Sequence, residues 1–376
     1  MRSRIAYALA APLVAAVLAI AVASIALLLA GHSPIETFRT MWQYLDSADS
    51  AVAVINRAVP YYVAGVAVAI GFKMGLFNIG ADGQYRLAAL LAAAAGAAVT
   101  LPAPIHVAFI FLVAISVGAA YAAITGILKV WRGVNEVVST IMLNFIATGI
   151  SAFLLAEYLR NPESNLIAET EEIAPSGVLP PLNRFLELFG YHLPTGTVLQ
   201  GFLPFAILLG VLYYVVVWRT RFGFELRNTG VNPAASLAAG VNPKHMILKT
   251  IMISGAVAGL IGLGPLLGDP QLHKYGDTFP TAIGFTGISI ALLGRNSPGG
   301  IAIAAVVWAG LERAGQSLPP IGVPQEIVQI LQGTLLLTAV IAFEVVRRFA
   351  AAAAVREAAR SMARSSPTRE PAGAVA

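Results

Sequence analysis

The stretch Gly-Leu-Phe-Asn-Ile-Gly-Ala-Asp-Gly-Gln-Tyr-Arg, from Gly75 to Arg86, lies between two long apolar runs. It carries three glycines, two amides (Asn78 and Gln84) and one carboxylate (Asp82). Hydrocarbon offers no water to polar side chains or to an irregular backbone, so such positions in a membrane must face protein or a wet cavity. The stretch therefore predicts a turn that is lined by protein.

The composition predicts an all-α integral membrane protein. Of 376 residues, 57% are hydrophobic and 11% are charged, and the mean hydropathy is +0.77. Soluble domains carry about 25% charged residues. The absence of cysteine excludes disulfides, thiolate catalysis and cysteine-ligated metals. Five histidines without the HExxH spacing give no metal site, and the net charge of +5 is interpreted as a sign of orientation rather than of nucleic-acid binding.

The apolar runs predict about ten transmembrane helices, some of them broken. The first run exceeds the 7 to 15 residues or so of a cleavable signal, so we expect an uncleaved span, followed by an interfacial helix near 35–45. The third run is short for a hydrocarbon core of about 30 Å, so this helix should begin near Gly80. The predicted spans are 5–30, 54–72, 87–99, 105–130, 137–155, 201–218, 246–267, 279–293, 301–311 and 327–346.

The charges predict that both termini are cytoplasmic. With ten spans, the cytoplasmic side holds 18 of the 24 Lys and Arg residues and 6 of the 19 acidic residues, as the positive-inside rule requires. Residues 157–198 then form an acidic external loop. We expect a polytopic membrane domain over 1–346, with a cytoplasmic loop at 219–249. Residues 347–376 would form a basic cytoplasmic tail, helical to about 363 and disordered beyond.

The loop at 219–249 contains a signature of a short helix outside the membrane. Asn232 suits the cap, Pro233 the first helical position and Gly240 the stop. Such a helix is small enough to seat in a groove of another protein and receive force, or it is a connector on lipid headgroups. The chain has no phosphate loop, no Gly-x-Ser-x-Gly nucleophile and no carboxylate pair deep in a span. It is therefore not predicted to be an enzyme, and energy must come from a gradient or a partner.

Four blocks in the same order resemble one family. They are 75–84 in the stretch above, Gly-Val-Asn-Glu-Val-Val-Ser-Thr-Ile-Met-Leu-Asn at 133–144, Arg-Asn-Thr-Gly-Val-Asn-Pro-Ala-Ala-Ser-Leu-Ala-Ala-Gly at 227–240, and Gly-Phe-Thr-Gly-Ile-Ser-Ile-Ala-Leu-Leu-Gly-Arg-Asn-Ser-Pro at 284–298. The family is the membrane permease subunit of bacterial nucleoside-type ABC importers, in the wider group that also serves ribose and branched-chain amino acids. One departure is Asp82, where the motif usually has glutamate.

The resemblance implies a heteromeric importer in the bacterial inner membrane. A substrate-binding lipoprotein would deliver a nucleoside outside, a second permease subunit would pair with this chain, and a cytoplasmic ATP-binding subunit would hydrolyse ATP. No cofactor would bind this chain. The ATPase would dock on the coupling helix, made of Asn232, Pro233, Ala234, Ala235, Ser236, Leu237, Ala239 and Gly240.

Eight polar or aromatic residues in the matching blocks are candidates for translocation or gating. For the three of them at the break, other interpretations stay open. Asp82 and Arg86 are four residues apart and suit an ordinary helix-surface ion pair, and the amides suit the satisfaction of broken backbone rather than contact with substrate. The candidates are Asn78, Asp82, Gln84, Asn135, Glu136, Ser139, Asn144 and Phe285.

The remaining candidates also have structural interpretations. Asn135 suits a helix cap, and Glu136 in the first turn favours the helix dipole. Ser139 and Asn144 suit hydrogen bonds between helices. Phe285, beside Gly284, suits either stacking on a nucleobase or packing.

Two alternatives to a nucleoside importer remain. The first keeps the ABC permease and changes the solute to ribose, another simple sugar or a branched-chain amino acid. The second is a gradient-driven secondary transporter, favoured by glycine-rich breaks in spans two to five and seven to ten that suggest an inverted repeat. Ion coupling usually needs carboxylates deep in spans, and the sequence places none there.

Overall fold

The computed structural model describes residues 2–164 and 167–365, and the regular secondary structure in this part of the chain is helical apart from one isolated bridge between Glu169 and Gly276. The helices are α1 (Arg2–Leu29), α2 (Pro34–Leu45), α3 (Ala48–Phe72), α4 (Ala81–Ala97), α5 (Ala103–Arg132), α6 (Glu136–Glu157), η1 (Pro175–Gly177), α7 (Asn183–Glu187), α8 (Leu203–Arg219), α9 (Arg221–Val231), α10 (Pro233–Ala238), α11 (Pro243–Gly259), α12 (Leu263–Gly268), α13 (Ile283–Leu293), α14 (Pro298–Gly315), η2 (Pro319–Ile321) and α15 (Glu326–Ser365).

The predicted all-α membrane fold is confirmed, and each predicted span overlaps an apolar helix. By length and composition, α3, α5, α6 and the α11–α12 segment can each cross a membrane, and the bent pairs α1–α2 and α8–α9 raise this number to six. Helix α4 begins at Ala81 after Gly80, as predicted. Helix α13 has 11 residues, or about 16 Å at 1.5 Å per residue, and is too short to cross alone. The count of ten crossings stays a prediction.

Two predicted spans differ in their boundaries, and one helix was not predicted. The eighth span was expected from residue 279, but α13 begins at Ile283 because Ala282 has a left-handed backbone (φ 62°). The ninth was expected over 301–311, whereas α14 extends it to Pro298–Gly315. Helix α9 was not predicted, because it lies in the segment 219–249 that was predicted to be a loop outside the short helix near 232–240. It bends by 69° from α8, and Thr220 caps it by accepting from the Gly223 amide.

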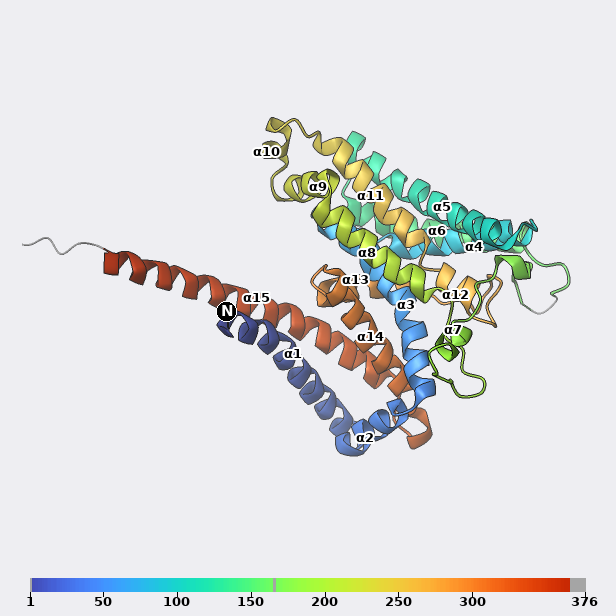
Figure 1. Ribbon diagram of the computed structural model, residues 1–376, viewed down its shortest axis with the longest axis horizontal. Helices are drawn as coiled ribbons and strands as arrows, with labels where there is room; N and C mark the ends of the chain where they lie inside the picture. Colours follow the sequence, from blue (N-terminus) through green and yellow to red (C-terminus); the bar gives the residue numbers. More distant parts are fainter. Residues whose placement is uncertain (1, 165–166, 366–376) are drawn as a thin grey trace, which may run out of the picture. The chain divides into compact units, whose positions relative to one another are not determined.

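The two ends of the chain, 1–37 and 323–376, form a compact unit of their own. Helix α1 lies along α15 in this unit (Figure 1). Small buried residues at a spacing of four (Ala15, Ala19 and Ala23) let the two helices approach, and Thr338 Oγ1 donates to the Ala15 carbonyl over 3.2 Å. Helix α15 passes position 346 without a break. The predicted division at 346 stays a prediction, and the tail beyond 365 lies outside the described residues.

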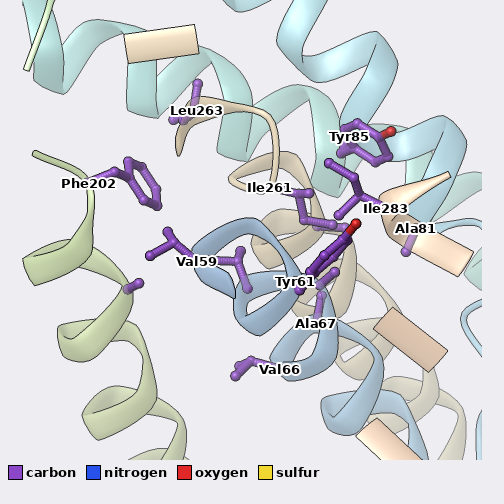
Figure 2. Packing of buried hydrophobic residues seen from close by; sticks show 14 of the residues in the cluster. Val59, Tyr61, Val66, Ala67, Ala81, Tyr85, Phe202, Ile261, Leu263 and Ile283 are labelled. Atoms are coloured by element: carbon purple, nitrogen blue, oxygen red, sulfur yellow. The ribbon is translucent and has the colours of Figure 1, made fainter. Parts of the chain in front are cut away.

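The second unit, 38–322, is packed around α3. Figure 2 shows side chains of this helix, Val59 and Tyr61 among them, surrounded by residues of α4 and of the segments near α8, α12 and α13. Glycines bring the other helices together. A Cβ on Gly118 of α5 would lie 2.2 Å from the Gly255 carbonyl oxygen of α11, so these two backbones are in direct contact. Close backbone packing of this kind is typical of helices in a membrane.

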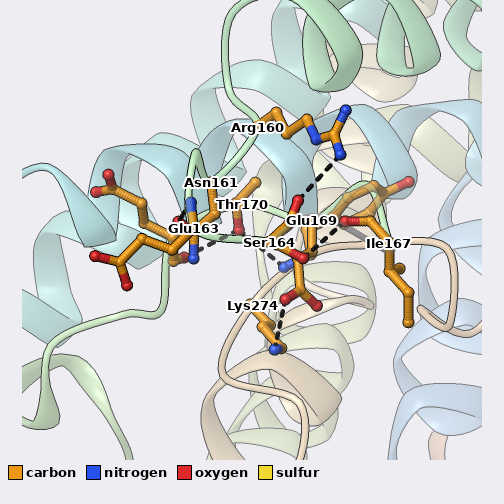
Figure 3. A network of polar contacts seen from close by, with 10 residues as sticks. Arg160, Asn161, Glu163, Ser164, Ile167, Glu169, Thr170 and Lys274 are labelled. Atoms are coloured by element: carbon orange, nitrogen blue, oxygen red, sulfur yellow. Dashed lines mark hydrogen bonds and ion pairs between the residues drawn. The ribbon is translucent and has the colours of Figure 1, made fainter.

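Two connecting segments lie together at one end of this unit. We call residues 158–202 the polar loop and residues 269–282 the return segment. Lys274 Nζ lies 2.9 Å from Glu169 Oε1, and the Thr170 amide donates to the Tyr275 carbonyl over 2.8 Å. Figure 3 shows this network, in which Arg160 also donates to the Ser164 carbonyl. The return segment is thus tied to the loop predicted to be external.

Acid is expected to loosen this attachment. The hydrogen bond from Lys274 lowers the pKa of the Glu169 carboxyl below its ordinary value of 4.5. A carboxyl with a lowered folded-state pKa contributes stability above its unfolded pKa and loses that contribution as the pH falls through the folded pKa. Hydrogen exchange, corrected for the intrinsic rate, should show falling protection of the Thr170 amide below pH 4.5. Glu169→Gln should remove this dependence. Unchanged protection in the unmodified chain would contradict the expectation.

Candidate functional site

The break between α3 and α4 is closed by a buried network of side chains. Asn78 Nδ2 donates to Gln84 Oε1 over 2.9 Å, and Gln84 Nε2 donates back to Asn78 Oδ1 over 3.0 Å. Asn78 also donates to Ser254 Oγ of α11 over 2.8 Å, and Ser254 donates to the Ala67 carbonyl of α3. Asn78 and Gln84 are 3% and 2% exposed. The predicted protein-lined turn is confirmed, and both amides are bonded within it.

Asn144 of α6 repairs the broken backbone from the other side. Its Nδ2 donates to the Ile79 carbonyl over 3.0 Å, and its Oδ1 accepts from the Gly83 amide over 2.9 Å. The predicted hydrogen bond between helices is therefore confirmed for Asn144. The same prediction is wrong for Ser139, because its hydroxyl donates to the Glu136 carbonyl of its own helix.

Replacing Asn144 by leucine is expected to destabilise the chain. It would leave the Ile79 carbonyl and the Gly83 amide without partners, at a cost of about 1–3 kcal/mol for each buried group. Thermal unfolding in detergent should show a clearly lower Tm. Met142→Ala is the matched control, because Met142 lies on the same helix and is 56% exposed. A Tm equal to that of the control would contradict this role for Asn144.

Asp82 joins α4 to the start of α13. The Gly284 amide hydrogen-bonds to the Asp82 carboxylate, and a Cβ on Gly284 would lie 2.3 Å from the Asp82 nitrogen. A carboxylate beside a helix N-terminus is stabilised by unpaired amides and by the helix dipole. Asp82 and Arg86 attract each other electrostatically, while Arg86 Nη1 donates its hydrogen bond to Thr148 Oγ1 of α6 over 3.1 Å. The Asp82 Oδ1 atom has no hydrogen-bond partner.

The remaining candidates lie apart from this network. Asn135 caps α6 by accepting from the Val137 amide, as predicted. Glu136 follows in the first turn and pairs with Lys129 over 2.5 Å. Phe285 is 44% exposed and does not belong to the walls of the two polar cavities described next. Gating and nucleobase stacking by the eight candidates stay predictions.

A larger polar cavity of about 580 Å³ lies between α3, α14 and the return segment. Its polar wall includes Asn56, Arg57 and Tyr61 of α3, Asp269, and Arg313 of α14. Arg57 Nε and the Tyr61 hydroxyl both bond Glu312 Oε2, at 2.5 Å and 2.7 Å. Sequence reasoning missed this site. The sequence did carry one signal for it. Arg57 is an ionisable residue inside the predicted span 54–72, and such a residue in a span indicates a functional site by default.

A smaller polar pocket of about 130 Å³ lies between α4, α6 and the return segment. Arg86, Ser151, Tyr275 and Asp277 line it, and Thr281 borders both this pocket and the larger cavity. Burial raises the pKa of the Tyr275 hydroxyl, so this phenol stays neutral at physiological pH. Thr281 lies just before α13 and borders both, so the start of α13 lies between the larger cavity and the smaller pocket.

The predicted coupling helix is present as α10, with its expected ends. Asn232 Oδ1 accepts from the Ala235 amide over 3.0 Å, and Gly240 has a left-handed φ of 83°. Ser236 is buried, and the helix otherwise presents exposed side chains, with Leu237 62% exposed.

The preceding helix α9 connects this region to the break. A Cβ on Gly230 would lie 2.7 Å from Met74 Cα. Leu226 packs in one buried cluster with Met74 and Leu76 of the break and with Met246 of α11. A displacement of α9 would therefore press directly on the break.

Comparison with known proteins gives a consistent family. Residues 50–340 match the family described as branched-chain amino acid transport system / permease component. The guanosine ABC transporter permease protein NupP of Bacillus subtilis is 33% identical over 87% of this chain and 91% of its own length. The glucose ABC transporter permease protein TsgB13 of Haloferax volcanii is 33% identical over 87% and 85%. The nucleoside ABC transporter permease protein NupB of Lactococcus lactis is 29% identical over 88% and 90%.

No solved structure matches the chain. The residues matched by the family include those that line both polar cavities, the break and the coupling helix. The similar proteins are aligned over about nine-tenths of their own length. The chain is a multi-pass membrane protein with a transport role, and it belongs to the branched-chain amino acid transport system / permease component family as an ABC transporter permease.

Proposed function

We propose that this chain carries nucleosides inward as the permease subunit of an ATP-driven importer, with both termini in the cytoplasm. The observation that carries the proposal is the exposed helix α10, which is mounted through α9 on the break between α3 and α4. A partner that moves α10 would move the break. The chain itself would hold no ATP and no other cofactor.

Three partners follow from this proposal. A cytoplasmic ATP-binding subunit would seat on α10, and its closure on ATP would rock the helices of this chain between two states. A second permease subunit would complete the path. A binding lipoprotein outside would deliver the solute to the side of the polar loop.

The proposed substrate class is a neutral solute with neighbouring hydroxyl groups. Similar permeases are named for guanosine, for glucose and for nucleosides, and these solutes share vicinal hydroxyls. The larger cavity offers both donors and acceptors, because Arg57, Arg313 and Asp269 all line it. We propose nucleosides rather than simple sugars because two of the three similar permeases are named for nucleosides.

Uptake by reconstituted vesicles tests the proposal. The chain and its partner subunits would be supplied with labelled guanosine, with and without ATP, in competition with ribose and leucine. We expect uptake that requires ATP and is blocked by nucleosides alone. Competition by ribose or leucine would show that the solute is a sugar or an amino acid, and the proposed ATP-driven mechanism would stand. Uptake that ignores ATP and collapses with a proton or sodium gradient would replace the proposal by a secondary transporter.

Labelling of single cysteines tests the proposed orientation, since the natural chain has none. Glu163→Cys in the polar loop should react from outside with an impermeant thiol reagent, and Leu237→Cys on α10 should react after the cells are opened. Both side chains are exposed on the protein surface, so the side of the membrane that the reagent can reach decides whether each cysteine reacts. Ser236 is unsuitable because it is buried. The reverse labelling pattern would overturn the orientation.

A further inference from the structure

The smaller polar pocket has two chemically distinct walls. One is aromatic: Tyr275 and Phe279 line it, with their ring centroids 4.7 Å apart. The other is polar and comes from Arg86 of α4 and Ser151 of α6, while the exposed Asp277 also lines the pocket. All of these residues belong to the unit 38–322. The pocket is thus formed within one compact unit and is open on the side of its exposed lining residues, Asp277 among them.

Buried polar atoms in this pocket lack partners. Ser151 is 3% exposed, and its Oγ atom has no hydrogen bond. Arg86 Nε is buried without a partner as well, although the same guanidinium donates to Thr148. Buried polar groups are nearly always hydrogen-bonded, and leaving one unpaired costs about 1–3 kcal/mol. A ligand with polar groups in this pocket would lie beside the two residues that carry these atoms.

The chemistry of the walls selects a neutral polyol. Arg86 and Asp277 carry opposite charges, so neither an anion nor a cation gains from the pair. Vicinal hydroxyls both donate and accept, and they can bond a guanidinium, a carboxylate and a serine hydroxyl together. The C–H face of a sugar ring is apolar enough to pack on Tyr275 and Phe279. The volume of about 130 Å³ suits a single sugar ring and excludes a ring with an attached base.

We infer that the smaller polar pocket binds the vicinal hydroxyls of the solute's sugar during passage. This inference rests on the proposed function and names the part of the solute that the permease recognises. Thr281 borders this pocket and the larger cavity, so the base of a nucleoside would remain on the larger side while its sugar enters the smaller one. The base would then contribute little to recognition inside this chain.

Direct binding to the full chain in lipid nanodiscs tests the inference without any partner subunit. Saturation-transfer NMR would compare methyl β-D-ribofuranoside with its 2,3-dideoxy analogue. We expect transfer to the first probe and none to the second. Ser151→Ala and Asp277→Ala should each weaken binding about fivefold to tenfold, through loss of one hydrogen bond to the sugar.

Thr125→Val is the matched control for these variants. Thr125 is 1% exposed and its Oγ1 atom also lacks a partner, but it lies on α5 outside the pocket. It should bind the ribofuranoside as the unmodified chain does. Absence of transfer to the ribofuranoside, equal transfer to the dideoxy probe, or full binding by the Ser151 and Asp277 variants would each overturn the inference.

Guanosine uptake by the complete transporter separates this inference from the proposed function. Ser151→Ala should raise the KM for uptake about fivefold to tenfold and leave the maximal rate within twofold. If the unmodified transporter takes up no nucleoside while the ribofuranoside still binds, the proposed function fails and the pocket stands. If uptake proceeds with an unchanged KM in both pocket variants, the inference fails and the function stands.

Discussion

Replacing both Ala235 and Ala239 with glutamate is expected to reduce ATP-dependent uptake at least about a hundredfold, with the chain still inserted and folded. Both positions are exposed on or beside α10, so the larger side chains meet no neighbour within the chain. A docked ATPase would have to bury two new charges, and an unpaired charge in an interface costs about 2–5 kcal/mol. Recovery of the ATPase with the tagged permease measures docking, and vesicle uptake measures coupling.

The matched control is the pair Ala235→Ser and Ala239→Ser, which adds small neutral groups at the same positions. This control should dock and transport within about twofold of the unmodified chain, because a hydroxyl at an exposed helix position has little effect. Normal recovery of the ATPase with the glutamate pair would show that α10 is not the docking helix. Normal docking without uptake would instead place the effect in transmission through α9.

The sequence predicted those features that depend on local rules. The amides and glycines of 75–86 had to be lined by protein because hydrocarbon cannot bond them, and the structure buries Asn78, Asp82 and Gln84. The caps of α6 and α10 were predicted because Asn135 and Asn232 act on amides two or three residues away. In each of these cases the partners are close in the sequence.

Contacts between distant residues were not predictable in the same way. The Glu312 carboxylate meets Arg57 across 255 positions of the chain, and no pattern in a single sequence specifies this pairing. The same reason explains the hydrogen bond of Arg86, which goes to Thr148, 62 positions away, and which nothing near Arg86 in the sequence indicated. The signal for Ser139 was equally ambiguous, because a serine in a helix can bond either another helix or its own carbonyls.

The pairing of α4 with α13 was also beyond the sequence, although both blocks were recognised. Gly83 belongs to the glycine-rich stretch 75–86 and Gly284 begins the fourth family block, but their neighbours come from other helices. A Cβ on Gly83 would lie 2.8 Å from the Ala147 Cβ of α6. The glycines in the sequence therefore mark positions where the backbone lies close to another helix, and the fold determines which helix that is.

Gly284→Val is expected to unfold the contact between α4 and α13 and to abolish uptake. Its Cβ would lie 2.3 Å from the Asp82 nitrogen and 2.5 Å from the Asp82 Cα, and these backbone atoms cannot rotate away as a side chain can. Overpacking typically costs about 1–3 kcal/mol, and here the Asp82 carboxylate would also lose the Gly284 amide. Gly149→Val is the matched control, because Gly149 lies in helix α6 with open space around its Cβ position. The measurement is Tm in detergent together with vesicle uptake. Equal Tm values and equal uptake for the two variants would contradict the close approach of α4 and α13, and with it the placement of Asp82 at the start of α13.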